Sequence, residues 1–297
     1  MDIDIMPTYA TRERGPSKEG KDGKTAKARA PTEPRLPVEL KDVEPKDPQF
    51  AYTLFKGLKI LEAFNAASYA LGNKEFCAAT QLGKSTVSRL TRTLVSMGYL
   101  RPVSGKKYQL GPAVLSLAYP LLANLPVRKH GHVPMQELAT AMHGVVTLGV
   151  FDRNELVFVE SCRNVRTMVT KPEIGARREL TSTPAGQVYL ASLDKDVRAA
   201  LVRNLPLPGG QDRAEVLATI ERREKELKTA GYCFSSYRGL NTISAPVHSS
   251  VQGEVYVLNC AVEDLQLNKS QMIAKVPPVL FSTINRIEQA LGVDRGH

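Results

Sequence analysis

The fold is decided by residues 83–94, which read GKSTVSRLTRTL. Val87, Leu90 and Leu94 recur at the three- and four-residue spacing that places side chains on one face of a helix. The opposite face is polar and basic, and it carries Lys84, Ser85, Ser88, Arg89 and Arg92. A helix that is apolar on its inner face and carries hydroxyls and arginines outside is typical of one that lies in a DNA groove.

Two helices precede this segment. Apolar residues from Leu54 onward recur at helical spacing and predict a first helix that ends near Ala67. A second helix is expected over residues 74–81, with Phe76 and Ala79 facing inward. The second of these helices is short.

A turn and a hairpin complete this module. Gly83 can supply the left-handed backbone that such a turn often needs, and Gly98 ends the basic helix. Residues 99–103 and 107–110 are expected to form two short strands around a three-residue tip. Three helices and a hairpin within about sixty residues predict a winged helix-turn-helix.

Most of the excess positive charge lies in this module. Residues 49–111 hold nine Lys and Arg against two Glu, a net charge of +7 out of +10 for the whole chain. Residues 1–48 are neutral overall and nearly free of large apolar side chains, so we expect a disordered tail there. A basic segment favours binding to a polyanion, with a merely solvated surface as the alternative, and the helix-turn-helix pattern favours the first.

The same segment contains a fragment of a nucleotide-binding motif. Gly83-Lys84-Ser85 matches the end of the phosphate-binding loop G-x-x-x-x-G-K-[ST]. That motif also needs a glycine five residues earlier, where this chain has Ala78, and a preceding strand, where a helix is expected. We therefore expect no nucleotide to bind here.

A linker over residues 112–133 is expected to contain an apolar helix. Pro112 is favourable in its first turn, and leucines dominate the next ten residues. Pro126 is expected to end or break this helix, and a further helix covers residues 134–142. An apolar helix between domains usually packs on a partner, most simply a second copy of the chain.

Strands and helices alternate in residues 134–297. A helix is expected to start at Pro184 after the cap Thr183, and another ends at Gly231. Strands are expected at 145–151, 156–161, 166–170, 232–235, 242–248 and 254–262. Strand pairs on either side of helices indicate an α+β domain with an antiparallel sheet.

No catalytic or metal-binding pattern stands out, and we expect no cofactor. The nucleophile pattern G-x-S-x-G is missing, and the four cysteines form no C-x-x-C pair, which indicates small buried residues in a reducing cytoplasm. His130 and His132 have no cysteine or carboxylate beside them, so surface or linker histidines are expected rather than a metal site. We expect no signal peptide, and no apolar run is long enough for a membrane span.

The loop over residues 180–186 is the best candidate for a binding pocket. It leads into the helix that starts at Pro184, where free backbone N–H groups and the helix dipole favour a carboxylate or another small anion. Thr242, Ser244 and Asn259 are polar residues on otherwise apolar strands. They either line the pocket or face solvent, and the pattern leaves both alternatives open.

Motifs in both halves of the chain match one known family. In the first half they are Phe64, Gly83-Lys84-Ser85-Thr86, Gly98-Tyr99-Leu100 and Tyr108-Gln109-Leu110-Gly111. In the second half they are residues 181–191, Gly231-Tyr232 and Ile243-Ser244-Ala245-Pro246-Val247. Over roughly residues 50–292 the chain therefore resembles the IclR family of bacterial transcription regulators.

The resemblance implies a GAF-like C-terminal domain that binds a small organic effector, frequently a carboxylate or an aromatic catabolite. It also implies dimers, often dimers of dimers, on palindromic operators. By resemblance, the effector contacts fall at Thr183, Pro184, Ala185, Gly186, Ser235, Thr242, Cys260 and Val262. Gln187 and Arg238 depart from a lysine and an acidic stretch common in the family, and Val262 stands where a hydroxyl is often found, which permits an anionic or a more apolar effector.

We therefore expect a ligand-responsive regulator with a tail (1–48), a winged helix-turn-helix (49–111), a linker helix (112–133) and an effector domain (134–297). DNA contacts are expected from Lys84, Ser85, Thr86, Ser88, Arg89, Arg92, Lys106 and Lys107. The expected partners are operator DNA, a small effector and a second copy of the chain, with no membrane. The alternatives are a metabolic enzyme that carries a helix-turn-helix, and an architectural DNA-binding protein whose C-terminal domain only dimerises.

Overall fold

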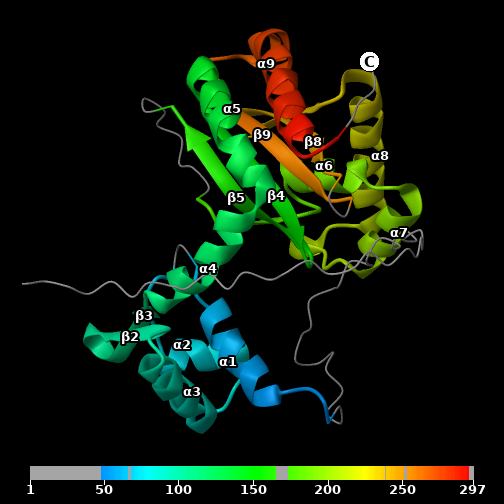
Figure 1. Ribbon diagram of the computed structural model, residues 1–297. Helices are drawn as coiled ribbons and strands as arrows, with labels where there is room; N and C mark the ends of the chain where they lie inside the picture. Colours follow the sequence, from blue (N-terminus) through cyan, green and yellow to red (C-terminus); the bar gives the residue numbers. More distant parts are fainter. Residues whose placement is uncertain (1–47, 66–67, 165–172, 238, 251–252, 294–297) are drawn as a thin grey trace, which may run out of the picture. The chain divides into compact units, whose positions relative to one another are not determined.

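The computed structural model describes residues 48–65, 68–164, 173–237, 239–250 and 253–293. The N-terminal elements are α1 (Tyr52–Glu62), β1 (Leu71–Gly72), α2 (Asn73–Thr80), α3 (Lys84–Ser96), β2 (Leu100–Val103), η1 (Ser104–Lys106) and β3 (Lys107–Leu110) (Figure 1). Two helices come next, α4 (Ala113–Asn124) and α5 (Pro126–Met142). The C-terminal elements are β4 (Val145–Asp152), β5 (Glu155–Arg163), β6 (Arg177–Glu179), α6 (Pro184–Ser192), α7 (Lys195–Asn204), η2 (Pro208–Gly210), α8 (Arg213–Ala230), β7 (Cys233–Tyr237), β8 (Leu240–His248), β9 (Val255–Glu263) and α9 (Lys269–Ala290).

The N-terminal elements form a winged helix-turn-helix, as the sequence predicts. Phe76 of α2 is fully buried at the centre of a small core with Ile60, Val87 and Leu100. The short strand β1 pairs with β3, and β3 pairs with β2, in a three-stranded antiparallel sheet. The hairpin wing is therefore confirmed, and β1 is an additional strand that the sequence pattern did not predict.

The first two helices differ in detail from the prediction. The helix α1 ends at Glu62 rather than near residue 67, and it turns Ile60 inward while Leu54 is exposed. On α2, Thr80 rather than Ala79 is buried. Thr80 is accommodated because its hydroxyl donates a hydrogen bond to a backbone carbonyl one turn earlier, at 2.7 Å.

The turn before α3 uses a different residue from the one expected. Gln81 has the left-handed backbone, with φ of 58°, whereas Gly83 is extended at φ of −66° and stands at the N-cap of α3. The end of α3 is as predicted, because Gly98 has φ of 77° directly after the last turn. The helix-turn-helix is thus formed with a non-glycine residue at its left-handed position.

The two helices of the linker meet at a proline. Pro126 ends α4 as expected, but it also occupies the first turn of α5, where its missing N–H is tolerated. The helix predicted to begin at residue 134 therefore begins eight residues earlier and runs through Pro134. Val127 and Gly131, which precede the expected domain boundary, are buried together with Met135 and Leu138 on the inner face of α5.

The C-terminal part contains an antiparallel six-stranded sheet in the order β6-β5-β4-β9-β8-β7. The two hairpins β4–β5 and β8–β9 meet along the β4–β9 pair. The expected α+β class is confirmed. The edge strand β6 was not predicted, and the strand expected at 166–170 lies outside the described residues.

Helices cover both faces of this sheet. On one face α5 and α9 pack side by side over a core that includes Met135, Leu148, Leu258 and Ile284 (Figure 1). On the other face, α6, α7 and α8 pack over a second core around Leu190. Side chains of the sheet strands alternate between these two layers, so a shift of one residue moves a side chain from one layer to the other.

Candidate functional site

The helix α3 presents a polar and basic surface. Lys84, Ser85, Ser88, Arg89 and Arg92 are exposed, and Thr86 is half-buried. The inner face holds Val87, Thr91 and Leu94, and the Thr91 hydroxyl donates to the Val87 carbonyl at 2.9 Å. The apolar side of α3 is thus fixed in the small core, while its cationic side remains available to a ligand.

The wing adds further cations. Lys106 and Lys107 are exposed at the tip, where Gly105 and Lys106 both have a left-handed backbone. Arg101 on β2 is also exposed, and its guanidinium donates to the Gln109 side chain on β3 at 3.0 Å. Arg101 is a basic wing residue that was not among the predicted contacts, although its place in the hairpin could have indicated it.

A cavity of about 760 Å³ lies in the C-terminal part, between α6 and the sheet. Its size is within the range of pockets that hold small organic molecules. Residues of β4, β5, β6, α6, α8, β7, β8, β9 and the loop before α6 line it: Val145, Thr147, Phe158, Arg178, Ser182, Thr183, Pro184, Ala185, Gln187, Arg223, Ser235, Ser236, Tyr237, Leu240, Thr242, Asn259 and Ala261.

Two arginines line this cavity, and one of them, Arg223, is paired with Glu226 at 2.8 Å. Arg178 and Arg223 contribute guanidinium groups, and no described residue of the lining is an Asp or Glu. Arg223 is held in place, because it donates to Gln187 at 3.2 Å, to the Phe234 carbonyl at 2.8 Å and to Ser235 at 2.8 Å. Its guanidinium thereby connects α8 to α6 and β7 around the cavity.

Arg178 is arranged differently. Its guanidinium lies over the ring of Phe158, 5.5 Å from the centroid, and donates to the Arg177 carbonyl at 2.8 Å. A cation stacked on an aromatic ring with donors to spare can receive a carboxylate in a bidentate manner. The lining thus offers an arginine beside an aromatic wall.

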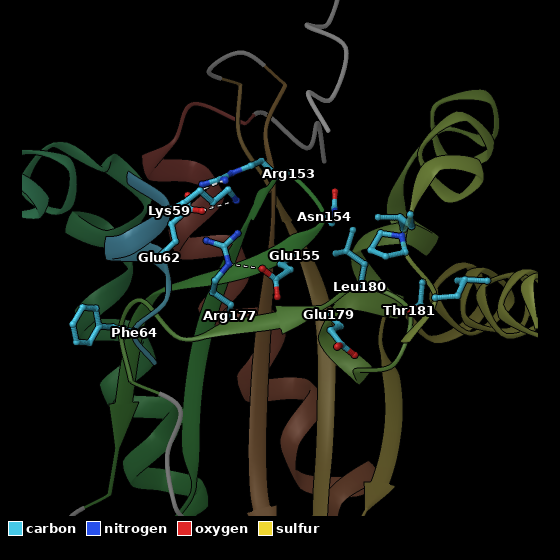
Figure 2. A pocket seen from close by; sticks show the side chains of 13 residues that line it. Lys59, Glu62, Phe64, Arg153, Asn154, Glu155, Arg177, Glu179, Leu180 and Thr181 are labelled. Carbon is cyan, nitrogen blue, oxygen red and sulfur yellow. Dashed lines mark hydrogen bonds and ion pairs between the residues drawn. The ribbon is translucent and has the colours of Figure 1, made fainter. Parts of the chain in front are cut away.

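The strand that carries Arg178 is anchored on its other side. Figure 2 shows Arg177 directed at Glu155 of the adjacent strand, with which it forms an ion pair. Arg177 also pairs with Asp152 at 2.9 Å. Partial burial lowers the pKa of Arg177, but the hydrogen bonds and charges of Glu155 and Asp152 outweigh it, so the pKa is raised overall. These pairs hold the short edge strand β6 against the β4–β5 hairpin.

Family models match both parts of the chain. The IclR helix-turn-helix domain matches residues 53–104, and the bacterial transcriptional regulator IclR C-terminal domain matches residues 120–287. The chain belongs to the IclR family. Members with this pair of domains are ligand-responsive, DNA-binding transcription regulators, and not enzymes, so the metabolic-enzyme alternative is set aside.

Individual relatives agree with this assignment. The HTH-type transcriptional regulator TsaQ1/TsaQ2 of Comamonas testosteroni is 28% identical over 82% of this chain and 90% of its own. The crystal structure of an IclR family transcriptional regulator from Brucella abortus is 30% identical, with a TM-score of 0.71 over 84% of this chain and 96% of that one. An IclR homolog from Microbacterium hydrocarbonoxydans, solved in complex with 4-hydroxybenzoate, is 21% identical with a TM-score of 0.66, over 82% and 100% of the two chains.

In this IclR-family chain, the structure brings together most of the predicted effector residues. Thr183, Pro184, Ala185, Ser235 and Thr242 all line the cavity. Asn259 lines it too, which decides one of the alternatives that the sequence left open. Ser244 is buried and its hydroxyl donates to the Asn259 side chain at 2.6 Å. Ser244 therefore holds Asn259 in position without lining the cavity itself.

Cys260 and Val262 do not line the cavity. Both are fully buried in the core between the sheet and the α5–α9 layer. Neighbouring residues of a strand point to opposite faces, and on β9 it is Asn259 and Ala261 that face the cavity. On this strand Asn259 and Ala261 therefore line the cavity, whereas Cys260 and Val262 lie on the opposite face of the sheet.

Gly186 lies behind the cavity and not in its lining. Its N–H donates to the Thr183 hydroxyl at 3.3 Å, which confirms the predicted cap of α6. A Cβ at Gly186 would lie 2.4 Å from the Leu180 Cα, so only glycine allows α6 to approach the preceding loop this closely. Its role in this IclR-family structure is to place Thr183 and the first turn of α6 against the cavity.

Among the described residues, no helix is long and apolar enough to cross a membrane.

Proposed function

We propose that the protein binds an operator through α3 and the wing, and that a small organic acid in the cavity controls this binding. The observation that carries the proposal is the cavity itself, in which Arg178 stands beside apolar and aromatic walls with no carboxylate among the described lining residues. The second arginine, Arg223, is already paired with Glu226, which lies outside the lining. An anion enters such a site with its charge compensated, whereas a cation would be repelled. DNA binding in the cytoplasm and effector binding are then two linked equilibria of one molecule.

On the DNA side, Arg89 and Arg92 are the proposed base readers. Both are exposed on α3, and an arginine that contacts guanine in a bidentate manner contributes about 1–3 kcal/mol of discrimination. Ser85, Thr86 and Ser88 are proposed to contact base edges or sugar, and Lys84, Lys106 and Lys107 to hold phosphates. The affinity should therefore fall as the salt concentration rises.

The double variant Arg89→Ala and Arg92→Ala tests this assignment. Specific operator binding, measured by fluorescence anisotropy against unrelated DNA of equal length, is expected to disappear while the oligomeric state is unchanged. Arg222→Ala on α8, which removes an exposed arginine from the C-terminal part, is the matched control and should bind as the wild type does. Specific binding that survives the double substitution would refute the assignment of α3.

On the effector side, Arg178 is proposed to bind the carboxylate and Phe158 to pack against an aromatic or apolar body. The IclR homolog solved with 4-hydroxybenzoate supports this class of effector, because it shares the fold. The test compares thermal shifts of the protein with aromatic acids and with their neutral amides. A ligand raises the melting temperature in proportion to RT ln(1 + [L]/Kd), so the acids should stabilise the protein and the amides should not.

Arg178→Gln should abolish the shift that the acids cause, and Arg203→Gln, an exposed arginine at the end of α7, should leave it intact. If neither acids nor amides shift the wild-type protein, the effector is not of this class. If acids and amides bind equally, the cavity recognises the body of the ligand and not its charge.

Self-association is proposed through α1 and α4. Leu115 and Tyr119 on α4 are more than 70% exposed, and Leu54 on α1 is 63% exposed. Exposed apolar residues repeated along two helices indicate a protein–protein interface, and a two-fold interface would match a palindromic operator. Substituting Leu115→Glu should lower the molar mass measured by light scattering, whereas Leu265→Glu, an exposed leucine elsewhere, should not.

A further inference from the structure

A second cluster of ligating side chains lies on the opposite face of the sheet from the effector cavity. His132 of α5 meets Glu160 and Cys162 of β5, and one ligand atom from each lies within 4.8 Å of the others. His132 is exposed, whereas Glu160 and Cys162 are almost fully buried. The cluster therefore has a solvent-facing side and a buried side, as a site open to an ion would.

A β-bulge places Glu160 in this cluster. The pairing of β4 with β5 shifts between Leu148 and Gly149, so that Leu148 pairs with Glu160 and Gly149 with Phe158. Val159 is the extra residue. In a regular strand of the same sequence, Glu160 would share a face with Phe158, which lines the effector cavity. The bulge instead turns the carboxylate toward α5.

The distances fit a tetrahedral ion. With metal–ligand lengths of about 2.0–2.3 Å, neighbouring ligand atoms of a tetrahedral zinc site are about 3.3–3.7 Å apart. The His132 Nδ1 atom lies 3.4 Å from Glu160 Oε2 and 3.8 Å from Cys162 Sγ. These separations leave room for an ion among the three atoms after small side-chain adjustments.

One oxygen of the carboxylate has charged neighbours but makes no hydrogen bond within the described residues. Glu160 Oε1 accepts a hydrogen bond from the Ser161 N–H at 3.0 Å. Glu160 Oε2 forms an ion pair with Arg128 Nε at 3.1 Å, but neither of these two atoms makes a hydrogen bond within the described residues. Glu160 is 3% exposed, and a buried charged oxygen without a hydrogen bond is costly. Arg128 is about one-third exposed, so its guanidinium can turn to solvent.

We propose that His132, Glu160 and Cys162 form a binding site for a divalent ion of the zinc class. The donor set of imidazole nitrogen, carboxylate oxygen and thiolate sulfur selects Zn²⁺ over Mg²⁺ or Ca²⁺, which prefer oxygen alone. Water from the exposed side is the fourth ligand. On binding, Cys162 loses its thiol proton to solvent, His132 binds as the neutral imidazole, and Arg128 gives up its place beside Glu160.

Such an ion would add a bridge between α5 and β5, which already meet through the Arg128–Glu160 ion pair and a hydrogen bond from the Gln136 side chain to the Arg163 carbonyl at 3.0 Å. His132 lies on α5, the helix after α4, and Glu160 lies two residues from Phe158 of the effector cavity. An ion at this position fixes α5 against β5 without entering the effector cavity. The proposal is independent of the effector, since it involves the other face of the sheet.

The test titrates the full chain with Zn²⁺ in competition with a chromogenic chelator, and with Co²⁺ followed by absorption. One equivalent per chain is expected, with a thiolate-to-cobalt charge-transfer band in the near ultraviolet. His132→Ala should weaken binding at least about ten-fold, Cys162→Ser should remove the charge-transfer band, and Arg128→Gln should strengthen binding because a competing cation is gone.

His130→Ala and Cys77→Ser are the matched controls, because both residues lie outside the cluster. His130 is exposed on the same helix, and both variants should bind Zn²⁺ as the wild type does. Because His132 is exposed, its loss should leave the fold intact, which circular dichroism verifies. Zinc binding that is absent in the wild type, or equal in the wild type and in the His132 and Cys162 variants, would overturn the proposal.

Discussion

Replacing Thr147 by valine should stabilise the protein and weaken its response to effector at the same time. Thr147 stands on β4 in the lining of the effector cavity and is 1% exposed. Its hydroxyl makes no hydrogen bond within the described residues. Rotation about χ1 can turn this hydroxyl into the cavity, where an effector can recruit it. Valine has the same shape but replaces the hydroxyl with a methyl group.

The two effects can be estimated separately. An unsatisfied buried hydroxyl costs about 1–3 kcal/mol, so its removal should raise the free energy of unfolding by about that much. For a domain of this size, each kcal/mol raises the melting temperature by about 2–4 °C. Loss of one neutral hydrogen bond to the effector costs about 0.5–1.5 kcal/mol, which is about a two- to thirteen-fold rise in Kd.

Calorimetry of the ligand-free protein and titration with an aromatic acid measure the two changes. The expected result is a higher melting temperature together with a higher Kd. A melting temperature that is unchanged or lower would show that the hydroxyl is satisfied in the free protein. A Kd that is unchanged would show that Thr147 does not touch the effector, and would weaken the assignment of this cavity.

Three further predictions concern packing and thiol chemistry. Gly186→Ala should destabilise the C-terminal part by about 1–3 kcal/mol and abolish effector binding, because the alanine Cβ would lie 2.4 Å from the Leu180 backbone. Urea unfolding measures the loss of stability, and titration with the effector measures the loss of binding. Phe76→Ala should cost about 3–5 kcal/mol and melt the winged domain, visible as an early separate transition in calorimetry. At pH 8, Cys77 should be the one thiol of the native chain that reacts rapidly with a thiol reagent, because the other three cysteines are buried. Burial also raises the pKa of the Cys260 thiol to about 12, which keeps it protonated at this pH. Rapid labelling of several thiols would contradict the packing.

The DNA-binding half could be predicted because its pattern is local. Val87 and Leu94 are buried where the helical spacing places them, and the exposed basic residues of α3 follow from the same spacing. The burial predicted from helical spacing was wrong at Leu54, which has the periodicity of a core residue but is exposed in the single chain. An apolar stripe that serves a partner and one that serves a core have the same period, so sequence alone does not separate them.

The loop beside the cavity could be located from the sequence, but the face that each β9 residue takes could not. The cap Thr183 and the loop before α6 were predicted from short-range signals, and both lie at the cavity. On β9 the polar pattern left Asn259 as one candidate, while the family resemblance placed the contacts at Cys260 and Val262. Helices cover both faces of the sheet, so all of β9 is apolar apart from Asn259 and its last residue. A strand without polar and apolar alternation does not show which face each residue takes.

The cluster of His132, Glu160 and Cys162 was beyond the reach of sequence patterns. The histidine precedes the two strand residues by 28 and 30 positions, and the register that brings them together depends on a bulge. A bulge is one extra residue in a strand, and β5 contains no proline or glycine that would indicate one. Only the pairing with β4 reveals that Val159 is unpaired.

The same bulge allows one short strand to serve both faces of the sheet. A regular strand of this sequence would place Phe158 and Glu160 on one face, and a carboxylate in the effector cavity would repel an organic acid. Because Val159 is inserted, Phe158 stays beside Arg178 while Glu160 faces His132. Separation of the acidic group from the cationic cavity is thus a consequence of register. Deleting Val159 would leave Phe158 and Glu160 as direct neighbours, which point to opposite faces of a regular strand, so both sites should survive the deletion with the loss of one buried valine.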